Sequence, residues 1–192
     1  VAAGQVLASD PHEESRTKFA DQLPGAQVTA DNAAVLAACD TIVLAVKPQM
    51  MGEALPSLQA LGNGSTLFVS IAAGTTIASF EDALGTRTPI VRTMPNTPAM
   101  VGRGITAICR NSHVTDADFA LARDLMAAVG QVVDLSGEDQ IDAVTAVSGS
   151  GPAYVFHLIE TMAAAGEAEG LPAAAAMKLA RATVCGAGEL AF

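Results

Sequence analysis

Three short stretches place a cation, very small side chains or a rigid polar loop directly after runs of apolar residues. Residues 45–48, Ala-Val-Lys-Pro, set a lysine and a proline after one such run. Residues 72–74, Ala-Ala-Gly, follow a second run with the small side chains that a flat ring needs to approach the backbone. Residues 94–98, Met-Pro-Asn-Thr-Pro, hold an amide and a hydroxyl between two prolines. Each pattern also occurs in ordinary turns, but the three in succession favour a binding site.

The histidines and cysteines are scattered along the chain, and their spacing predicts neither a metal site nor a redox pair. They are His12, His113, His157, Cys39, Cys109 and Cys185. We expect the cysteines to be small buried thiols of a reduced, cytoplasmic protein.

The charge and the apolar patterning of the chain disfavour two classes of partner, nucleic acids and membranes. The formal net charge is −10, and no basic stripe offsets it, which disfavours nucleic acid as a ligand. No uninterrupted apolar run reaches the roughly 18 residues of a membrane span. The first residues also lack the pattern of a secretory signal, so we expect neither a membrane nor a nucleic-acid partner.

Strand and helix patterns alternate over the first two thirds of the chain. Apolar, β-branched runs predict strands at 6–9, 26–29, 41–46, 66–71, 89–94, 104–109 and 131–135. Capping residues and periodicity predict helices at 11–23, 31–39, 75–85 and 115–130. This alternation predicts an α/β fold with a Rossmann-like, doubly wound, mostly parallel sheet. Ligands of such sheets bind beyond the carboxyl ends of the strands, which is where the three stretches lie.

Beyond Gly137 the strand patterns cease and helical spacing takes over. Two long helices are predicted, one after Pro152 and one after Pro172, so we place a domain boundary at 137/138. Between helices lies Val-Ser-Gly-Ser-Gly-Pro-Ala-Tyr, residues 147–154, which we interpret as a structured corner. Its glycines, Gly149 and Gly151, should permit backbone turns and close approach. It does not follow a strand, as a phosphate-binding glycine loop would, and no Gly-x-Gly-x-x-Gly follows a strand elsewhere in the chain.

In order and spacing, four motifs resemble those of the Δ1-pyrroline-5-carboxylate reductase family: Ala-Val-Lys-Pro at 45–48, Ser-Ile-Ala-Ala-Gly at 70–74, Val-Arg-x-Met-Pro-Asn-Thr-Pro at 91–98, and the stretch from Asp142 to Tyr154. The resemblance covers the chain from Ser9 to Phe192. It implies a dinucleotide-binding domain, residues 1–137, and the start of a helical dimerisation and substrate domain, residues 138–192. It further implies that the family's first strand and glycine loop lie upstream of Val1, and that a substrate-holding loop lies downstream of Phe192.

The resemblance implies hydride transfer from NADP(H), or NAD(H), to the C=N bond of pyrroline-5-carboxylate, giving proline. It also implies a homodimer or a larger homo-oligomer joined through the helical domain. No catalytic acid or base is required, because a protonated cyclic imine already accepts a hydride and the protein chiefly orients two rings.

Matched positions then receive roles. Ser9 and Asp10 are expected to meet the adenosine ribose, and Asn32 to reach the adenine. Residues 45–48 line the central channel of the cofactor. Residues 72–74 approach the nicotinamide, and residues 94–97 close that end of the site. The cofactor-binding positions are Ser9, Asp10, Asn32, Ala45, Val46, Lys47, Pro48, Ala72, Ala73, Gly74, Met94, Pro95 and Asn96. The substrate-side positions are Thr97, Ser148, Gly149 and Ser150, with Asn96 and Thr97 orienting the reactants.

Two other functions remain open at this point. One is a different Rossmann dehydrogenase, such as a β-hydroxyacid dehydrogenase, which would need a catalytic lysine in the helical region. Lys178 is the sole lysine there, and no asparagine stands beside it at helical spacing. The other is a non-catalytic nucleotide-binding or dimerisation module.

Overall fold

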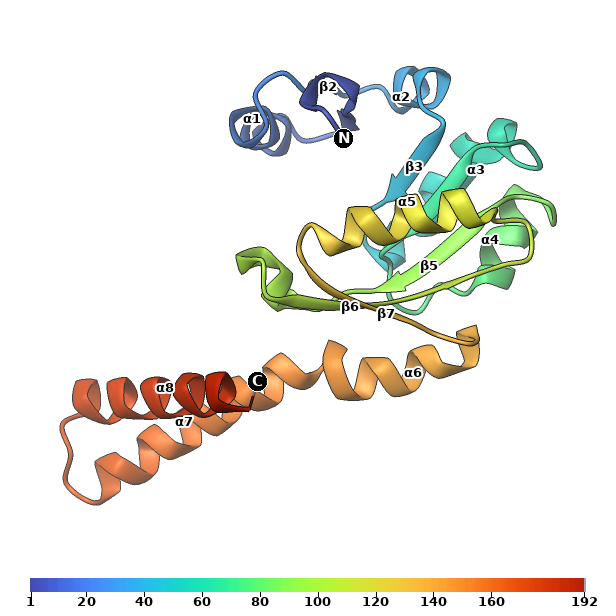
Figure 1. The fold of residues 1–192 in the computed structure, drawn as a ribbon. Coiled ribbons are helices and arrows are strands. Elements are labelled where there is room, and N and C mark those ends of the chain that lie inside the picture. Colours follow the sequence, from blue (N-terminus) through green and yellow to red (C-terminus); the bar gives the residue numbers. More distant parts are fainter. Residues whose placement is uncertain (192) are drawn as a thin grey trace.

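The computed structural model describes residues 1–191, in which seven strands form two sheets (Figure 1). The smaller sheet pairs β1 (Leu7–Ser9) with β2 (Gln27–Thr29) in parallel. The larger has the order β3-β4-β5-β6-β7. Its strands are β3 (Thr41–Leu44), β4 (Leu67–Ser70), β5 (Ile90–Met94), β6 (Gly104–Arg110) and β7 (Gly130–Asp134). Within it, β5 and β6 pair antiparallel and all other neighbours are parallel, so the predicted mostly parallel α/β sheet is confirmed.

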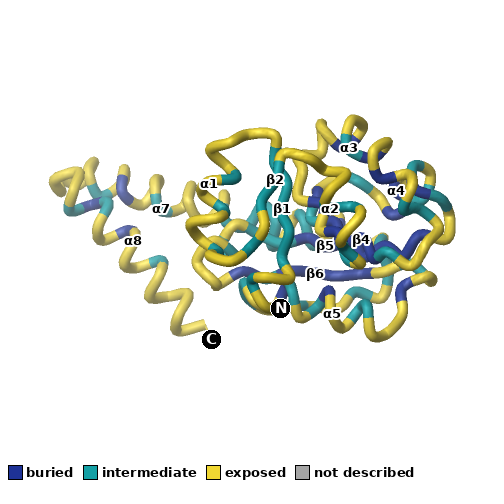
Figure 2. The backbone as a smooth tube through the Cα atoms, turned by 90° about the horizontal axis from the view of Figure 1, so that it is seen from above, coloured by how far each residue is buried: buried dark blue, intermediate teal, exposed yellow. Residues whose placement is uncertain are grey.

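Helices cover both faces of the larger sheet (Figure 1). The helices of the α/β region are α1 (Glu13–Gln22), α2 (Asn32–Ala38), α3 (Met51–Leu58), α4 (Ile77–Leu84) and α5 (Asp116–Ala127). One core packs α3 and α4 against residues such as Phe68 and Ile90, and the other packs α5 against Val69 and Val91. Successive residues of β4 and β5 thus point into different cores, and both strands are buried along their whole length (Figure 2). This burial explains their continuous apolar sequence.

After β7 the chain is helical. A short 3-10 turn, η5 (Glu138–Gln140), leads into α6 (Ile141–Val144), a π-helical turn η6 (Thr145–Gly149) and the long helix α7 (Gly151–Ala168). A last helix, α8 (Ala173–Leu190), returns antiparallel along α7, and the pair projects away from the sheet (Figure 1). Alanines form the contact between them: Ala163, Ala176 and Ala180 are all buried. These small side chains let α7 and α8 pack closely against each other. Phe192, with which the predicted helical domain ends, lies outside the described residues.

Helix capping follows the sequence signals. The Asp31 carboxylate accepts from the Ala33 amide, Thr76 Oγ1 from the Ser79 amide and Thr115 Oγ1 from the Asp118 amide. These caps satisfy amides that have no partner inside the first helical turn.

Several expectations need correction. The strand predicted to reach residue 46 ends at Leu44, and the helix predicted to stop at Gly130 ends at Ala127. Gly130 instead opens β7 with φ +151°, where a Cβ would lie 2.0 Å from the Gly104 carbonyl oxygen. The third helix, α3, was not predicted, although its buried residues are spaced by four and three. Of the three thiols only Cys109 is buried, whereas Cys39 is half-buried and Cys185 is exposed.

The corner at 147–154 is also different from the prediction. Gly149 and Gly151 do not have positive φ angles, and the chain passes through them in a helical conformation. Gly149 serves close approach alone, because a Cβ there would lie 2.6 Å from the Met94 Cε. Gly151 faces open space, with nothing within 4 Å of such a Cβ. Among the described residues, no helix combines the length and apolarity needed to cross a bilayer.

Candidate active site

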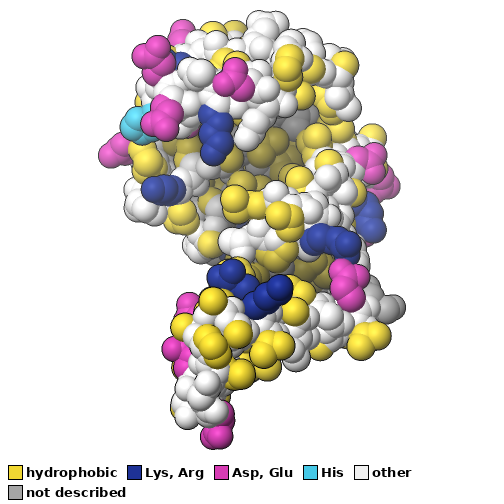
Figure 3. All heavy atoms as spheres, turned by 90° about the vertical axis from the view of Figure 1, so that its left-hand side faces the viewer, with side chains coloured by type: hydrophobic (Ala, Val, Ile, Leu, Met, Phe, Trp, Pro, Cys, Tyr) yellow, Lys and Arg dark blue, Asp and Glu magenta, His cyan; other side chains and the backbone are white. Residues whose placement is uncertain are grey.

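The registers of β3, β4 and β5 bring the three predicted stretches to one edge of the sheet. Leu44 pairs with Ser70, and Ser70 pairs with Arg92, all in parallel. Residues 45–48, 71–74 and 95–97 therefore follow the strand ends side by side, at the edge toward which β3 and β5 run in Figure 1. Figure 3 views the molecule from this direction and shows a hollow between its upper part and the middle. The sequence prediction that these stretches share one site is thus consistent with the strand registers.

The Lys47 segment and the small-residue segment are open to solvent at this edge. Residues 45–48 are exposed, and Pro48 begins the 3-10 turn η2 (Pro48–Met50). None of the ion pairs described for residues 1–191 includes Lys47, whose charge stays available to a ligand. In the neighbouring segment, Ala72 is buried while Ala73 and Gly74 are exposed. Gly74 has φ +75°, a left-handed conformation that glycine adopts without strain.

Asn96 joins the proline-bracketed loop to the helical region. Its Oδ1 accepts from the Ile105 amide at 3.0 Å, and its Nδ2 donates to the Ser148 carbonyl at 3.2 Å. Two residues earlier, Met94 Cε packs where Gly149 lacks a side chain. The structure thus brings Met94 and Asn96 together with Ser148 and Gly149, although 52 residues separate Asn96 from Ser148 in the sequence. Thr97 follows as the exposed first residue of η4 (Thr97–Val101).

Ser148 and Gly149, which are predicted to lie on the substrate side, are part of the π-helical turn η6. The Ser150 amide donates to the Thr145 carbonyl at 2.8 Å, which closes the wide turn. Two carbonyls of the turn accept hydrogen bonds from side chains. Asn96 Nδ2 donates to the Ser148 carbonyl, and the Tyr154 hydroxyl donates to the Ala146 carbonyl at 3.2 Å. Single π-helical turns are rare and occur often at functional sites, and this one presents its backbone toward the Asn96 loop.

The predicted adenosine end forms a second cluster, at the ends of β1 and β2. Ser9 Oγ donates to Asn32 Oδ1 at 2.5 Å, so these two predicted residues are in contact. Asp10 uses one carboxylate oxygen to accept from the His12 amide at 2.8 Å. Arg16 reaches back from α1 and donates to the carbonyls of Asp10 and Pro11. A carboxylate and a guanidinium therefore lie close to the predicted adenosine end, and in this fold class such groups can discriminate ribose from ribose phosphate.

An ion pair between the buried Arg92 and the partly exposed Glu138 was not predicted. Arg92 in β5 is 5% exposed and donates to Glu138 Oε1 at 2.5 Å. The signal was an arginine inside the otherwise apolar run of residues 90–94, because a buried guanidinium requires a partner. Beside this pair lies Cys109. Burial, and next the negative charge of Glu138, raise the pKa of the Cys109 thiol to about 11, against a lowering influence of Arg92.

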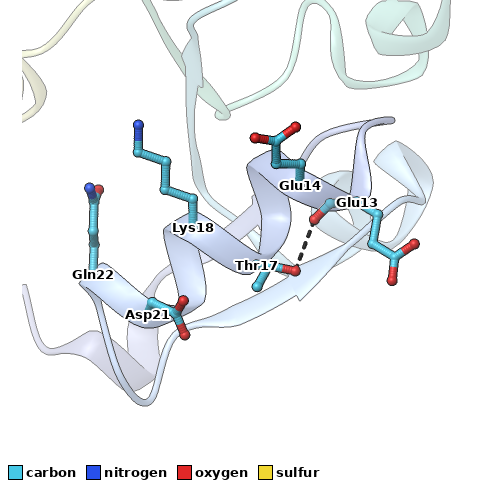
Figure 4. Close-up of a pocket in the computed structure, with 6 residues that line it drawn as sticks. All are labelled: Glu13, Glu14, Thr17, Lys18, Asp21 and Gln22. Carbon is cyan, nitrogen blue, oxygen red and sulfur yellow. Dashed lines mark hydrogen bonds between the residues drawn. The ribbon is translucent and has the colours of Figure 1, made fainter.

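One surface depression lies apart from the predicted site residues. A shallow depression on α1 is lined by Glu13, Glu14, Thr17, Lys18, Asp21 and Gln22 (Figure 4). None of the predicted site residues contributes to it, and its charged groups are mostly carboxylates. Within residues 1–191, no cluster of histidine, cysteine, aspartate or glutamate is arranged to hold a metal ion.

Comparisons with known proteins point to one family of reductases. A family model described as pyrroline-5-carboxylate reductase dimerisation matches residues 138–192. One described as NADP oxidoreductase, coenzyme F420-dependent, matches residues 1–74. A pyrroline-5-carboxylate reductase of Pseudomonas aeruginosa is 44% identical over 192 residues, which are 100% of this chain and 70% of that protein.

Solved structures give the same result. A pyrroline-5-carboxylate reductase from Coxiella burnetii aligns with a TM-score of 0.89 and 36% identity, over 96% of this chain and 68% of that one. The Plasmodium falciparum enzyme, solved with NADP bound, aligns with a TM-score of 0.83 and 31% identity, over 96% of this chain and 66% of that one.

Proposed function

This chain belongs to the pyrroline-5-carboxylate reductase family, and from that premise we propose how its own residues carry out the reaction. The activity is an NADP(H)-dependent reduction of the C=N bond of 1-pyrroline-5-carboxylate, which gives L-proline. The observation that carries the residue assignment is the contact of Asn96 with Ser148, because it joins the cofactor edge of the sheet to the helical region.

The residues at the sheet edge fit a dinucleotide. We assign the hydroxyl and amide of Ser9 and Asn32 to the adenosine half, and the exposed cation of Lys47 to the anionic centre of the cofactor. The small, exposed residues Ala73 and Gly74 leave the backbone accessible to a flat ring. The reduced nicotinamide, when bound, supplies the hydride.

The protein's own part is orientation. Asn96 joins its loop to the π-helical turn, and we assign Thr97 and residues 148–150 to the substrate side of the site. We assign proton supply to the substrate itself, because a cyclic imine is basic enough to be partly protonated near neutral pH. Holding two reactants in a near-attack arrangement supplies several orders of magnitude in rate.

We propose that residues 1–137 form the cofactor domain and residues 138–192 the helical domain. The family match supports a homo-oligomer. We place its interface on α7 and α8, which expose large apolar side chains: Tyr154 and Phe156 are each 60% exposed and Leu179 is 56% exposed. Sedimentation of a Phe156→Glu variant should show dissociation, and an unchanged mass would contradict this placement.

We also propose a cytoplasmic location. Cys39, Cys109 and Cys185 are free thiols, which suits a reducing compartment. Fractionation of cells that make the protein, with thiol labelling under non-reducing conditions, tests the proposal. Recovery outside the cytoplasm or as a disulfide-linked species would contradict it.

The activity is tested with the full-length protein, by following NADPH oxidation with pyrroline-5-carboxylate and, in parallel, NADP+ reduction with a series of β-hydroxyacids. We expect turnover with the imine alone. Turnover with a hydroxyacid but not with the imine would assign the site to a different dehydrogenase reaction.

A further inference from the structure

One carboxylate holds three separate elements together below the site. Glu138 Oε1 accepts from Arg92 Nη1 at 2.5 Å and from the Ile77 amide at 2.7 Å. Arg92 lies in the central strand β5, Ile77 is the first residue of α4, and Glu138 begins the helical region in η5. The contact therefore connects the sheet, a helix packed on it and the start of the helical domain.

The Arg92 side chain has no evident packing reason to be charged. It is 6% exposed and projects from a strand whose neighbours in the same core are apolar, such as Ile90 and Met94. An apolar residue would fill such a position without the cost of removing a guanidinium from water. The Glu138 carboxylate compensates that charge, and the positive end of α4 favours it further.

The three elements joined by Glu138 each lead directly to one part of the proposed site. Residues 72–74 come shortly before Ile77, at the entry to α4. Asn96 follows four residues after Arg92, and Ser148 follows ten residues after Glu138. The helical segment from 138 to 149 is thus attached to the sheet at both ends, at its start by Glu138 and at its end by the contacts of Ser148 and Gly149 with the Asn96 loop.

We propose that Glu138 is a positioning residue for hydride transfer: through Arg92 and the first turn of α4, it sets the substrate-side turn 148–150 against the nicotinamide-side segment 72–74. This inference rests on the proposed function of those two segments. Glu138 itself contacts neither reactant. Its loss should impair the relative placement of the two sides, while the adenosine end of the cofactor site, formed by β1 and β2, stays intact.

Three variants and one control test this role. Glu138→Ala removes the junction, and Glu138→Gln keeps an acceptor oxygen but removes the charge. The double variant Arg92→Met with Glu138→Met removes both charges and leaves no uncompensated guanidinium. The control is Glu81→Ala. Glu81 lies in α4, the helix whose first amide Glu138 binds, and its carboxylate accepts from Asn111 Nδ2 at 2.8 Å at the end of the helix away from the site.

For each variant we would measure thermal unfolding, the dissociation constant for NADPH without substrate, and kcat and KM for pyrroline-5-carboxylate well below the unfolding temperature. We expect Glu138→Ala to lower kcat/KM for the imine by about 10-fold to 100-fold, the loss that a small misplacement of reacting groups causes. The NADPH dissociation constant should change by less than about 2-fold. Glu138→Gln should lie between Glu138→Ala and the unaltered protein, and Glu81→Ala should keep its kinetic constants.

The double variant separates an effect on positioning from an effect on stability. It does so even if Glu138→Ala fails to fold. We expect it to regain thermal stability without regaining turnover. Recovery of both, or a Glu138→Ala protein that is less stable yet turns over normally, would overturn the inference and leave a purely structural ion pair. A loss of NADPH affinity as large as the loss of kcat/KM would overturn the inference as well. Failure of the unaltered protein to reduce pyrroline-5-carboxylate would instead refute the proposed function, before any variant is compared.

Discussion

Replacing Asn96 by alanine is the most direct test of the contact between the cofactor edge and the helical region. The side chain makes two hydrogen bonds, accepting from the Ile105 amide at 3.0 Å and donating to the Ser148 carbonyl at 3.2 Å. Alanine removes both, and it leaves one amide and one carbonyl without a partner in partly buried surroundings.

The expected loss of stability follows from these two bonds. A hydrogen bond contributes about 0.5–1.5 kcal/mol net, so their loss should lower the free energy of unfolding by about 1–3 kcal/mol. For a chain of this length each kcal/mol shifts the unfolding temperature by about 2–4 °C, and 2 kcal/mol therefore by about 4–8 °C. The loss of kcat/KM should be larger than stability alone explains, about 10-fold to 100-fold, because the π-helical turn loses its tie to the loop.

The chain offers a closely matched control at the other end of β5. Asn111 also accepts from a backbone amide, that of Ile90, and also donates to a backbone carbonyl, that of Thr88. Its burial class is the same as that of Asn96. Asn111 also accepts from the His113 amide and donates to Glu81 Oε1, so Asn111→Ala should cost at least as much stability as Asn96→Ala. It should nevertheless leave kcat and KM within about 2-fold of their original values.

The assay is steady-state NADPH oxidation with pyrroline-5-carboxylate, combined with thermal unfolding of both variants under the same buffer conditions. If the two variants lost the same stability and the same activity, Asn96 would act through general stability alone. If Asn96→Ala kept full activity, the contact with Ser148 would not serve the site, and the assignment of residues 148–150 to the substrate side would be wrong.

Three further predictions concern single residues. Lys47→Ala should raise KM for NADPH about tenfold with little change in kcat, since a lost charge-assisted contact weakens binding by roughly that factor; an unchanged KM would remove Lys47 from the cofactor site. Asp10→Ser should shift the ratio of kcat/KM values toward NADPH, because the carboxylate repels a 2′-phosphate, and a constant ratio would show that Asp10 faces elsewhere. Cys109 should lower stability at alkaline pH: its pKa is raised from 9.0 to about 11 by burial and by Glu138, so between these values the unfolded chain loses the proton that the folded chain keeps. Denaturant titrations should show stability falling by roughly 1–3 kcal/mol more across that range than in Cys109→Ala, and equal pH profiles would contradict the shift.

Local signals in the sequence were sufficient for most elements of the fold. Continuous apolar runs identified β4 and β5 because both strands are covered on both faces, so every side chain had to be apolar or paired. Capping residues placed the starts of α2, α4 and α5. The helix α3 was missed because it contains Pro56, and proline usually argues against a helix interior. The helix is stabilised instead by the packing of Met51 and Leu55 into the core.

The site was predictable only in part, for a similar reason. Strand ends and motifs identify segments one at a time, and the parallel registers then bring those segments to one edge. The contact of Asn96 with Ser148 and that of Arg92 with Glu138 join residues 52 and 46 positions apart, and no local pattern encodes such pairs. The π-helical turn was unpredictable as well, because two of its carbonyls accept from side chains outside the turn, those of Asn96 and Tyr154.

The uneven burial of the chain has a consequence for how the cofactor binds. None of residues 1–41 is buried, whereas β4 and β5 are buried throughout (Figure 2). When residues 1–192 are studied on their own, the unit of β1, β2 and α1 should therefore open locally at a small fraction of the global unfolding free energy, and its amides should exchange with solvent long before those of the central strands. Because the adenosine half of the cofactor is assigned to this unit, each opening transiently removes part of the binding site. Measured affinity then includes the fraction of time that the unit is closed, and substitutions that stiffen it should tighten cofactor binding without touching the cofactor.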